Sequence, residues 1–470
     1  MKPACCDPRS SYDLAVLGGG SAAFAAALRA SELGARVLVV NEGALGGTCV
    51  NVGCVPSKTL IRAAENAHQD GLSRFRDIHA RRGTVDFPEL VREKDELVAG
   101  LRKARYADVA ARDPRIEVAV GRGRLLGPGA LEVDGRPVRV RFVLIATGAR
   151  PARPALPGLD DPGVWDSTSA LAAGSLPREL LVLGGRYVAL ELAQLFARLG
   201  SRVTVIQRSE RILPQEDVEV SDLLAACLRA EGIEIRTGCD LLRVGKDGDR
   251  RFAEVRVGEG VVRSTADAVL AALGRRPNSE DLPGIELDPR GYVRVDPYLE
   301  TSVPGVFAAG DVIGDPMFVY AAAYEGRLAA ENALSGRRRP RDYTALPFVV
   351  FTDPQVAGVG PTEQEARDAG LEVEVSHLPL DKVPRALAAR DTRGFVKLLR
   401  ARGAPNLLGA RVVAPEGGEQ ILEASLMIRF GLPVEEVARH FHPYLTQGEA
   451  LKLALLGFEK DVDALSCCAN

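Results

Sequence analysis

Two copies of one strand–turn–helix–strand pattern constrain the fold of this chain more than any other feature. The first covers residues 12–40, where DLAVLGGG leads into SAAFAAALRASELG and ARVLVV. The second covers residues 179–208, where ELLVLGG leads into YVALELAQLFARLG and SRVTVIQR. An apolar strand that ends at glycines and opens a helix is the pattern of a dinucleotide-binding βαβ unit. The sequence therefore predicts an α/β protein with two Rossmann-like domains and two nucleotides that exchange a hydride.

The rest of the chain divides around these two units. RFVLIATGARP is a buried strand that ends at Thr-Gly and Pro, VLAALGRRPN closes the second unit in the same way, and TSVPGVFAAGDV returns to an apolar strand. We expect the first domain to be split into residues 1–150 and 276–344, with the second domain, residues 151–275, inserted into it. From about residue 345 to 470 the strands FVVF and FVKLL alternate with helices such as GGEQILEASLMIRFG, which predicts a separate α+β interface domain.

The composition argues against nucleic-acid and membrane partners. The net charge is −3, and acidic and basic residues are interspersed. No apolar run approaches the roughly 18 residues of a membrane helix, and no apolar stretch follows the N-terminal Lys to serve as a secretory signal. We therefore expect a cytoplasmic protein. Eight cysteines in 470 residues are too few for a disulfide scaffold, so paired cysteines in a reducing compartment favour catalysis or metal binding.

Cys49 and Cys54 form the first cysteine pair, within GGTCVNVGCVPSK. In an undistorted helix their Cα atoms would lie about 7.5 Å apart, beyond the usual disulfide range of about 4.4–6.8 Å. Gly53 and the loop before it must therefore bring the sulfurs together, which favours a working disulfide over a structural one. Pro56 is expected to be the first residue of the following helix, whose positive end would stabilise a thiolate.

The first glycine turn fits a phosphate-binding spacing. Gly18, Gly20 and Ala23 match G-x-G-x-x-A, which lets the backbone approach a pyrophosphate at a helix N-terminus. The next strand ends at Asn41 and Glu42, about where an acid meets a ribose hydroxyl. Either Asn41 contacts the ribose as an amide, or Glu42 is the acid and the backbone is shifted.

The second glycine turn is less regular. Gly184 and Ala189 keep their places, but Arg186 stands where the second glycine usually lies. Arg186 would either obstruct the pyrophosphate or contact it with its charge. The following strand ends at Gln207 and Arg208 without an acid, and a guanidinium in place of a carboxylate favours a 2′-phosphate. We therefore expect NADPH rather than NADH.

Five features together resemble the flavin-dependent pyridine nucleotide–disulfide oxidoreductases: GGTCVNVGCVPSK, ATG, the second nucleotide turn, AAGD and the C-terminal interface domain. The resemblance covers nearly the whole chain. Within that family, HPYLTQGEALKLA and the ending DVDALSCCAN, together with DPQVAGVG and DKVPRALAARDTRGFVKL, look like the mercuric reductase branch. That branch uses NADPH to reduce Hg(II) to elemental mercury. The resemblance implies a homodimer whose active site forms between subunits, with FAD between NADPH and the redox-active disulfide.

The resemblance also implies roles for single residues. Cys49 would attack the bound substrate, and Cys54 would be the thiolate in contact with the flavin. Lys58 would pair with Glu191 near the reactive flavin nitrogen, and Tyr187 would gate the nicotinamide pocket. The implied FAD site comprises Gly18, Gly20, Ala23, Asn41, Glu42, Gly47, Thr48, Lys58, Ala146, Thr147, Gly148, Gly310 and Asp311. The implied NADPH site comprises Gly184, Arg186, Tyr187, Ala189, Gln207, Arg208 and Gly274.

The second cysteine pair ends the chain. By the same resemblance, Cys467 and Cys468 of the partner subunit would collect Hg(II) and pass it to Cys49 and Cys54, with Tyr444 beside the path. Neighbouring Cα atoms are about 3.8 Å apart, too close for an unstrained disulfide, whereas adjacent thiolates suit a soft metal ion. The alternatives are a tail with incidental cysteines, or a relay of electrons to a protein disulfide.

The chain departs from the family pattern at two places. Gln447 replaces the Glu that would orient His442, which would leave a weaker acid/base group. There is no GMTCxxC heavy-metal motif, although Cys5 and Cys6 form a further vicinal pair ahead of the first strand. Two other functions therefore stay open: an NADPH-dependent thiol–disulfide reductase, or a metal-sequestering protein without turnover.

Overall fold

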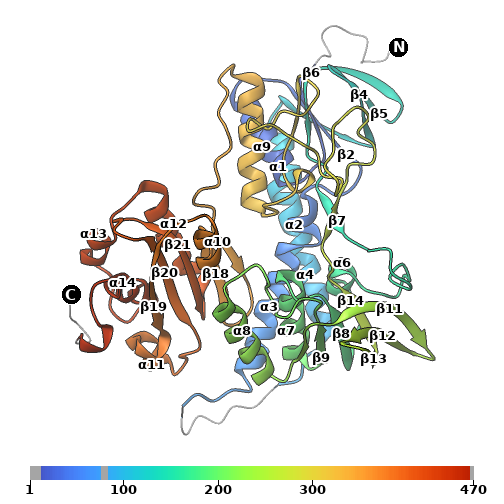
Figure 1. Cartoon of the computed structure of the whole chain (residues 1–470). Coiled ribbons are helices and arrows are strands. Elements are labelled where there is room, and N and C mark those ends of the chain that lie inside the picture. The colour runs from blue at the N-terminus through green and yellow to red at the C-terminus, as the bar shows by residue number, and fades with distance from the viewer. Residues whose placement is uncertain (1–11, 76–82, 466–470) are drawn as a thin grey trace.

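The computed structural model describes residues 12–75 and 83–465 and arranges them as three packed bodies, each containing helices and strands (Figure 1). Hydrophobic residues of the first body lie on both faces of one mixed sheet. Its strands run in the order β3-β2-β1-β6-β5-β4, and β16 also pairs with β6. The bounds of these strands are Tyr12–Leu17 (β1), Val37–Asn41 (β2), Ile116–Val120 (β3), Gly123–Gly127 (β4), Ala130–Val133 (β5), Arg136–Ile145 (β6) and Val306–Ala308 (β16).

The pairing of β16 with β6 brings two distant parts of the sequence into one sheet. β16 runs parallel to β6, although the whole second body lies between them in the chain. Helices α1 and α9 pack against each other beside this sheet (Figure 1). The helices of the first body are Ser21–Glu32 (α1), Gly47–Asn51 (α2), Cys54–Gln69 (α3), Phe87–Arg102 (α4), Lys103–Ala107 (η3), Asp108–Arg112 (α5), Asp311–Ile313 (η4) and Val319–Leu334 (α9).

The second body contains a parallel sheet and an antiparallel meander that packs on it. The parallel sheet has the order β10-β9-β8-β14, with β8 Glu179–Leu183, β9 Arg202–Ile206, β10 Glu234–Arg236 and β14 Ala268–Ala271. The meander comprises Asp240–Asp247 (β11), Arg250–Val257 (β12) and Gly260–Ala266 (β13). The helices are Ser167–Leu171 (α6), Tyr187–Leu199 (α7) and Val218–Ala230 (α8). The chain enters and leaves this body through one antiparallel pair, Ala149–Pro151 (β7) and Arg275–Pro277 (β15).

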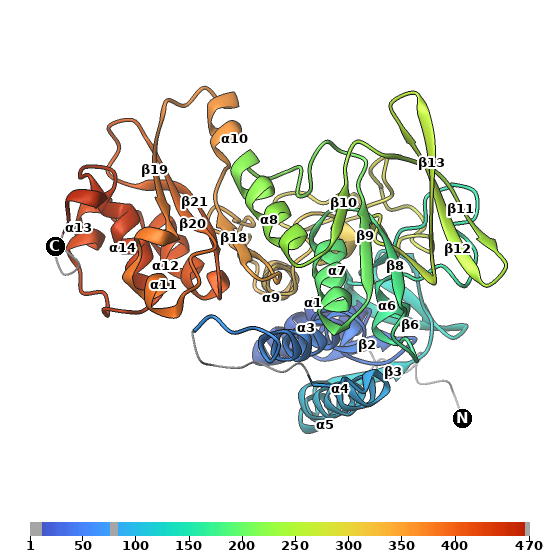
Figure 2. The same cartoon turned by 90° about the horizontal axis from the view of Figure 1, so that it is seen from below.

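The third body is a five-stranded antiparallel sheet covered by helices, seen at the left of Figure 2. Its order is β17-β18-β21-β20-β19. The strands are Phe348–Val350 (β17), Gln355–Val359 (β18), Val373–Pro379 (β19), Phe395–Ala401 (β20) and Leu407–Ala414 (β21). The helices are Glu363–Asp368 (α10), Leu380–Lys382 (η5), Pro384–Ala389 (α11), Gly417–Phe430 (α12), Val434–Arg439 (α13), Gly448–Leu456 (α14) and Val462–Ala464 (η6).

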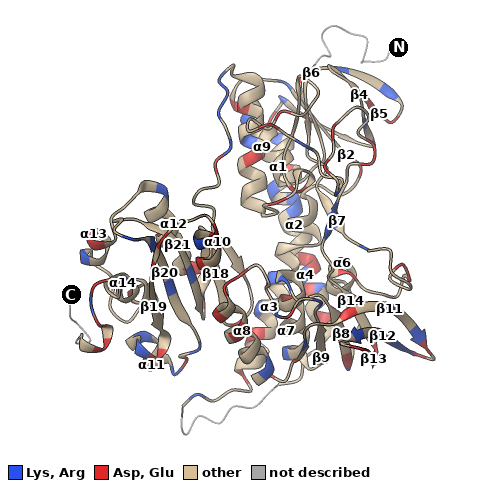
Figure 3. Cartoon of the chain, viewed as in Figure 1, with Lys and Arg blue, Asp and Glu red and all other residues tan. Residues whose placement is uncertain are grey.

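The predicted fold class is confirmed: two Rossmann-like units and a separate α+β domain are present. The domain limits at residues 150, 275 and 344 stay predictions. Acidic and basic side chains are interspersed over all three bodies (Figure 3). Within residues 12–75 and 83–465, no helix has the length and apolar character needed to cross a membrane.

Candidate active site

The first glycine turn connects β1 to α1 and is closely packed. Gly18 has φ +119, and a Cβ there would lie 2.2 Å from Ala146 O. A Cβ on Gly47 would lie 2.6 Å from Gly20 Cα, and Gly47 has φ +59. Side chains are therefore excluded where the two loops meet. Backbone N–H groups at such a bare turn suit a pyrophosphate.

Asn41 borders this turn, whereas Glu42 is exposed. A Cβ on Gly19 would lie 2.7 Å from Asn41 Cγ, and Asn41 Nδ2 donates to Gly43 O at 2.5 Å. The position expected for an acid thus carries a half-buried amide that packs on the turn. Of the two alternatives for the ribose contact, this placement favours the Asn41 amide.

Beside the first glycine turn, hydrogen bonds connect the two segments that flank the inserted body; we call this the second wall of the proposed flavin site. Thr147 Oγ1 donates to Asn278 O at 2.7 Å, and Asn278 N donates to Gly148 O at 2.9 Å. Arg275 and Asp311 follow on this wall, with 3.4 Å between Arg275 Nε and Asp311 Oδ2. Arg275 Nε is buried without a hydrogen-bond partner among the described residues.

The polar groups on this wall fit a bound flavin. Burial raises the pKa of Asp311, and Arg275 opposes that shift. A half-buried carboxylate and an unsatisfied guanidinium N–H call for polar partners, and the hydroxyl groups of a ribityl chain are such partners. The bare glycine turn and this polar wall together suit FAD.

The paired cysteines lie on consecutive helices. Cys49 lies on α2, and Cys54 is the first residue of α3, so the predicted helix start at Pro56 is wrong by two residues. The helix accommodates Pro56 because the first four N–H groups of a helix have no intrahelical partner. Gly53 permits the tight connection, since a Cβ there would lie 2.9 Å from Thr48 O.

The two thiols are free, half-buried and chemically different. The hydrogen bond from Cys49, and then the Lys58 ammonium, lower the pKa of Cys54 to about 7 against the opposing effect of burial. The pKa of Cys49 is raised, because its proton is held by Cys54 and because the thiol is buried. Cys54 is therefore the thiolate of the pair near neutral pH, and Cys49 is the protonated partner.

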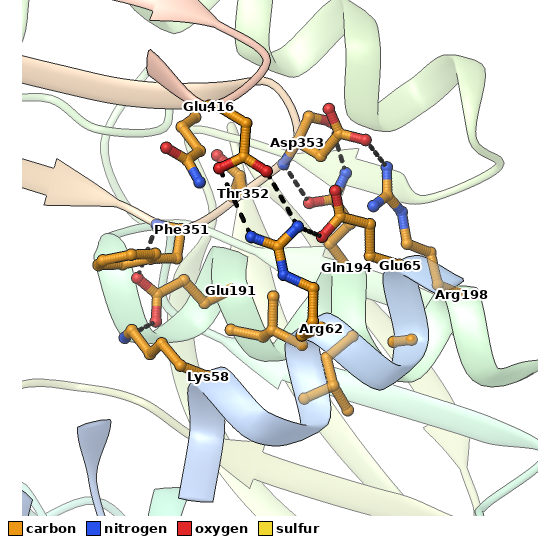
Figure 4. A pocket seen from close by; sticks show the side chains of 14 residues that line it. Lys58, Arg62, Glu65, Glu191, Gln194, Arg198, Phe351, Thr352, Asp353 and Glu416 are labelled. Carbon is orange, nitrogen blue, oxygen red and sulfur yellow. Dashed lines mark hydrogen bonds and ion pairs between the residues drawn. The ribbon is translucent and has the colours of Figure 1, made fainter. Parts of the chain in front are cut away.

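Lys58 and Glu191 form an ion pair one helical turn beyond Cys54 (Figure 4). Lys58 Nζ donates to Glu191 Oε2 at 2.7 Å, and Phe351 N donates to Glu191 Oε1 at 2.9 Å. Lys58 Nζ also lies 4.6 Å from the centroid of the Phe351 ring. The pair borders a cavity of about 120 Å³ between α3, α7 and the third body. Arg62 lies between two carboxylates in Figure 4, 2.9 Å from Glu416 Oε1 and 2.7 Å from Glu65 Oε2.

The second glycine turn connects β8 to α7. Gly184 has φ +116, and a Cβ there would lie 2.5 Å from Ala272 O. Arg186 is the N-cap residue of α7, with extended backbone and an exposed side chain. It therefore does not fill the turn. Ala189 is buried at the close-packing position, and Gly274 has φ +106 with no atom within 4 Å of an added Cβ.

A second cavity, of about 360 Å³, opens beside this turn. Its walls include Gly184, Gln207 and Arg208, three of the residues that the resemblance assigns to NADPH, and also Cys239 and Arg256. Arg256 belongs to β12 of the meander, so no local motif identifies it. Two guanidinium groups on one cavity wall suit the 2′-phosphate of NADPH.

Tyr187 packs between the second and third bodies. Its ring stacks on Phe348, with 5.8 Å between centroids and 9° between planes. Burial, and then Glu216, raise the pKa of Tyr187 to about 12, while a hydrogen bond from Gln215 opposes the shift. The ring therefore stays neutral, and it lies one helical turn before Glu191 on α7.

The C-terminal region contradicts one expectation. His442 does have a carboxylate partner: its Nε2 lies 2.8 Å from Glu423 Oε1, and its Nδ1 lies 3.0 Å from His440 O. Both ring nitrogens therefore lie within hydrogen-bond distance of an oxygen, which fixes the orientation of the ring. Glu423 lies on α12 and was missed because it is distant from the motif. Gln447 Oε1 is buried without a hydrogen-bond partner among the described residues.

The remaining predicted metal ligands lie outside the described residues. Cys467 and Cys468 fall there, as do Cys5 and Cys6. Tyr444 is described and is 52% exposed. Within residues 12–75 and 83–465 no group of three or more His, Cys, Asp or Glu side chains is placed to hold a metal ion.

Two nucleotide turns, a thiol pair at a helix start and a neighbouring Lys–Glu pair define a flavin- and pyridine-nucleotide-dependent thiol enzyme. The chain belongs to the pyridine nucleotide–disulphide oxidoreductase family, whose profile matches residues 12–326. The dimerisation domain of this family matches residues 346–455, which supports a homodimer. Its cofactors are FAD and NADPH.

Relatives named mercuric reductase align with almost the whole chain. The protein from Streptomyces lividans is 46% identical, and the alignment covers 98% of this chain and 99% of the relative. The protein from Bacillus cereus is 43% identical over 98% of this chain and 73% of the relative. Among solved structures, the HOCl-induced flavoprotein disulfide reductase RclA from Escherichia coli is similar, with 30% identity and a TM-score of 0.83 over 94% of this chain and 98% of that chain.

Proposed function

We propose that this protein is an NADPH-dependent mercury(II) reductase. NADPH supplies two electrons as hydride, Hg(II) accepts both to become elemental mercury, and one proton is released. The observation that carries the proposal is the unequal thiol pair: Cys54 with its pKa lowered to about 7, beside Cys49 and the Lys58–Glu191 pair. Soft thiolate ligands are those that a soft metal ion selects.

The flavin, when bound, transfers electron pairs between nicotinamide and thiol-bound substrate. The turn at Gly18 and Gly20, with Asn41, would hold its nucleotide end, and Asp311 its ribityl chain. Lys58 would lie near the reactive ring, with its ammonium fixed by Glu191. Since Glu191 receives bonds from both Lys58 and Phe351, Lys58 has one preferred position.

The nicotinamide side is controlled by Tyr187. The stacked Tyr187–Phe348 pair would cover the entrance until the nicotinamide ring replaces it. Arg208 and Arg256 would hold the 2′-phosphate on the wall of the second cavity, which would position the dinucleotide before hydride transfer.

The thiols bind the substrate by exchange. Hg(II) enters as a thiol complex, each incoming sulfur forms one Hg–S bond, and one Hg–S bond to the departing thiol breaks. A thiol that becomes a ligand passes its proton to the departing thiolate, so charge and atoms balance. Cys467 and Cys468 of the partner subunit would deliver the ion past Tyr444 to Cys49 and Cys54. We place the enzyme in the cytoplasm, where such thiols stay reduced.

The test is NADPH oxidation by the purified yellow protein with Hg(II) and excess small thiol. The Cys467→Ala/Cys468→Ala double variant is compared with wild type, with Cys227→Ala as a matched control at a buried cysteine. Mercury-dependent oxidation that falls only in the double variant, and most with a bulky competing thiol, supports both the reaction and the delivery route. Mercury binding without NADPH oxidation would instead indicate a sequestering protein.

The His442–Glu423 pair favours a second candidate, thiol–disulfide reduction. Such a reaction must protonate a departing thiolate, and a carboxylate-oriented imidazole is suited to that task. Glu423→Gln separates the two functions. Disulfide turnover, if this is the activity, falls at least tenfold in the variant, whereas Hg(II) reduction is unchanged because no leaving thiolate depends on His442.

A further inference from the structure

Glu325 is a buried carboxylate next to the flavin loop that no motif singles out. It lies on α9 and is 1% exposed. Gly310 N donates to its Oε2 at 2.6 Å, and Tyr343 Oη donates to its Oε1 at 2.5 Å. Burial raises its pKa, and the bonds from Tyr343 and Gly310 oppose this shift. Such a buried carboxylate is costly unless its oxygens are hydrogen-bonded, so both donors matter.

The first of these bonds acts on the loop that contains Asp311. Gly310 has φ +78, and a Cβ there would lie 3.3 Å from Ala22 Cβ and 3.4 Å from Ala322 Cβ. The loop therefore passes between α1 and α9, and its backbone conformation at residue 310 favours glycine. Anchoring the Gly310 N–H to Glu325 fixes the peptide that immediately precedes Asp311.

The second bond connects this loop to the third body. Tyr343 belongs to the segment 335–347, which runs from α9 to β17. That segment is in turn attached to α12, because Ser425 Oγ donates to Ala345 O at 2.7 Å and Arg429 pairs with Asp342. A continuous chain of contacts thus runs from α12 through Tyr343 and Glu325 to the flavin loop.

The close packing of α9 against α1 explains why the Glu325 side chain reaches the Gly310 loop. A Cβ on the next residue, Gly326, would lie 2.0 Å from Ala22 O. α9 and α1 therefore approach closely at this turn, and no water-filled space separates Glu325 from the loop. The carboxylate reaches Gly310 from the helix that supports the flavin side of the fold.

We infer that Glu325 is a positioning residue for the flavin, because it fixes the Gly310–Asp311 loop. Through its bond to Tyr343, the affinity for flavin also depends on the position of the third body relative to this loop. The inference rests on the proposed contact of Asp311 with the ribityl chain. It concerns binding of FAD and is independent of the identity of the reducible substrate.

The test measures FAD release from the purified full-length holoenzyme on dilution, followed by flavin fluorescence. Glu325→Leu removes both hydrogen bonds to a buried charged group and is expected to weaken FAD binding about 10- to 100-fold. Glu325→Gln keeps an oxygen that accepts from Gly310 N and is expected to restore binding to within about threefold. Tyr343→Phe removes one bond and is expected to weaken binding about threefold to tenfold.

The matched control is Tyr324→Phe. Tyr324 precedes Glu325 on α9, and its hydroxyl accepts from Asp342 N at 2.9 Å, so this variant removes a bond between the same two segments without touching Glu325. FAD binding in the control is expected to stay within about twofold of wild type, since the lost bond is neutral and exposed.

The outcomes separate the inference from the proposed function. A Glu325→Leu holoenzyme that retains FAD as tightly as wild type overturns the inference, as does an equal loss in Tyr324→Phe. If Glu325→Leu does not fold, the other three variants decide. The inference requires Tyr343→Phe to bind FAD more weakly than both Glu325→Gln and Tyr324→Phe, and any other order overturns it. A wild-type protein purified without FAD would overturn the flavin assignment itself.

Discussion

Replacing Cys49 with Ala tests the assignment of the two thiols directly. The hydrogen bond from Cys49 is the largest cause of the shift that lowers the pKa of Cys54 from 9.0 to about 7. A pKa of about 7 in place of 9 corresponds to a preference for the thiolate of roughly 3 kcal/mol. Hydrogen bonds to charged groups contribute about 1.5–3 kcal/mol, so this one bond accounts for most of the shift.

The expected result is a pKa of Cys54 near 9 in the Cys49→Ala variant. Without Cys49, burial raises the pKa and Lys58 is the main group that lowers it. At pH 7 the thiolate fraction would fall from about one half to about 1–3%. The rate of alkylation by iodoacetamide, measured against pH on the reduced holoenzyme, reports this fraction. The rate at pH 7 should fall about 15- to 50-fold.

The experiment is cleanest when Cys467 and Cys468 are replaced in both proteins, because iodoacetamide then reports on fewer thiols. Cys227→Ala is the matched control, because it removes a buried thiol elsewhere and should leave the alkylation profile unchanged. The reasoning is refuted if the profile of the Cys49→Ala variant keeps its midpoint near pH 7. That result would assign the shift to Lys58 and the start of α3 alone.

Three further outcomes follow from the structure. Arg208→Gln and Arg256→Gln should each raise the KM for NADPH about tenfold and leave that for NADH unchanged in steady-state assays; equal effects on both would remove the 2′-phosphate assignment. Arg411→Met leaves the buried Glu216, normally 2.6 Å from Arg411 Nε, without its partner and should lower the free energy of unfolding by about 3–5 kcal/mol. Because burial raises the pKa of Glu216, protonation relieves the unpaired charge, so the urea-measured loss should be smaller at pH 5 than at pH 7. Gly47→Ala should abolish FAD retention, since its Cβ would meet the glycine turn at 2.6 Å, whereas Gly43→Ala, with open space around it, should not.

The parts of the fold that could be predicted are those encoded by short stretches of sequence. The βαβ units follow from short-range periodicity and glycine placement, so β1, α1, β8 and α7 lie where the patterns predict them. The start of α3 was misplaced because proline is tolerated at several positions of the first helical turn, and the sequence does not distinguish them.

The missed residues share one property: each reaches its site from a distant element. Glu423 contacts His442 from α12, Arg256 joins Arg208 from the meander, and Glu325 reaches Gly310 from α9. Each contact depends on tertiary packing, and nothing in the spacing of one segment encodes it. Gln447 replaces the Glu of the family motif, but a carboxylate from Glu423 on α12 contacts His442 instead.

The antiparallel pair β7–β15 has a consequence for how such an enzyme changes its reductant. Both crossings into the second body lie side by side, since Ala149 is paired with Pro277 and Pro151 with Arg275. An insert whose ends are adjacent can be exchanged without lengthening or rerouting its host. The nucleotide preference of the enzyme therefore resides in a cassette of chain, roughly the segment between these strands, that selection or design can replace while the flavin and thiol machinery stays in place.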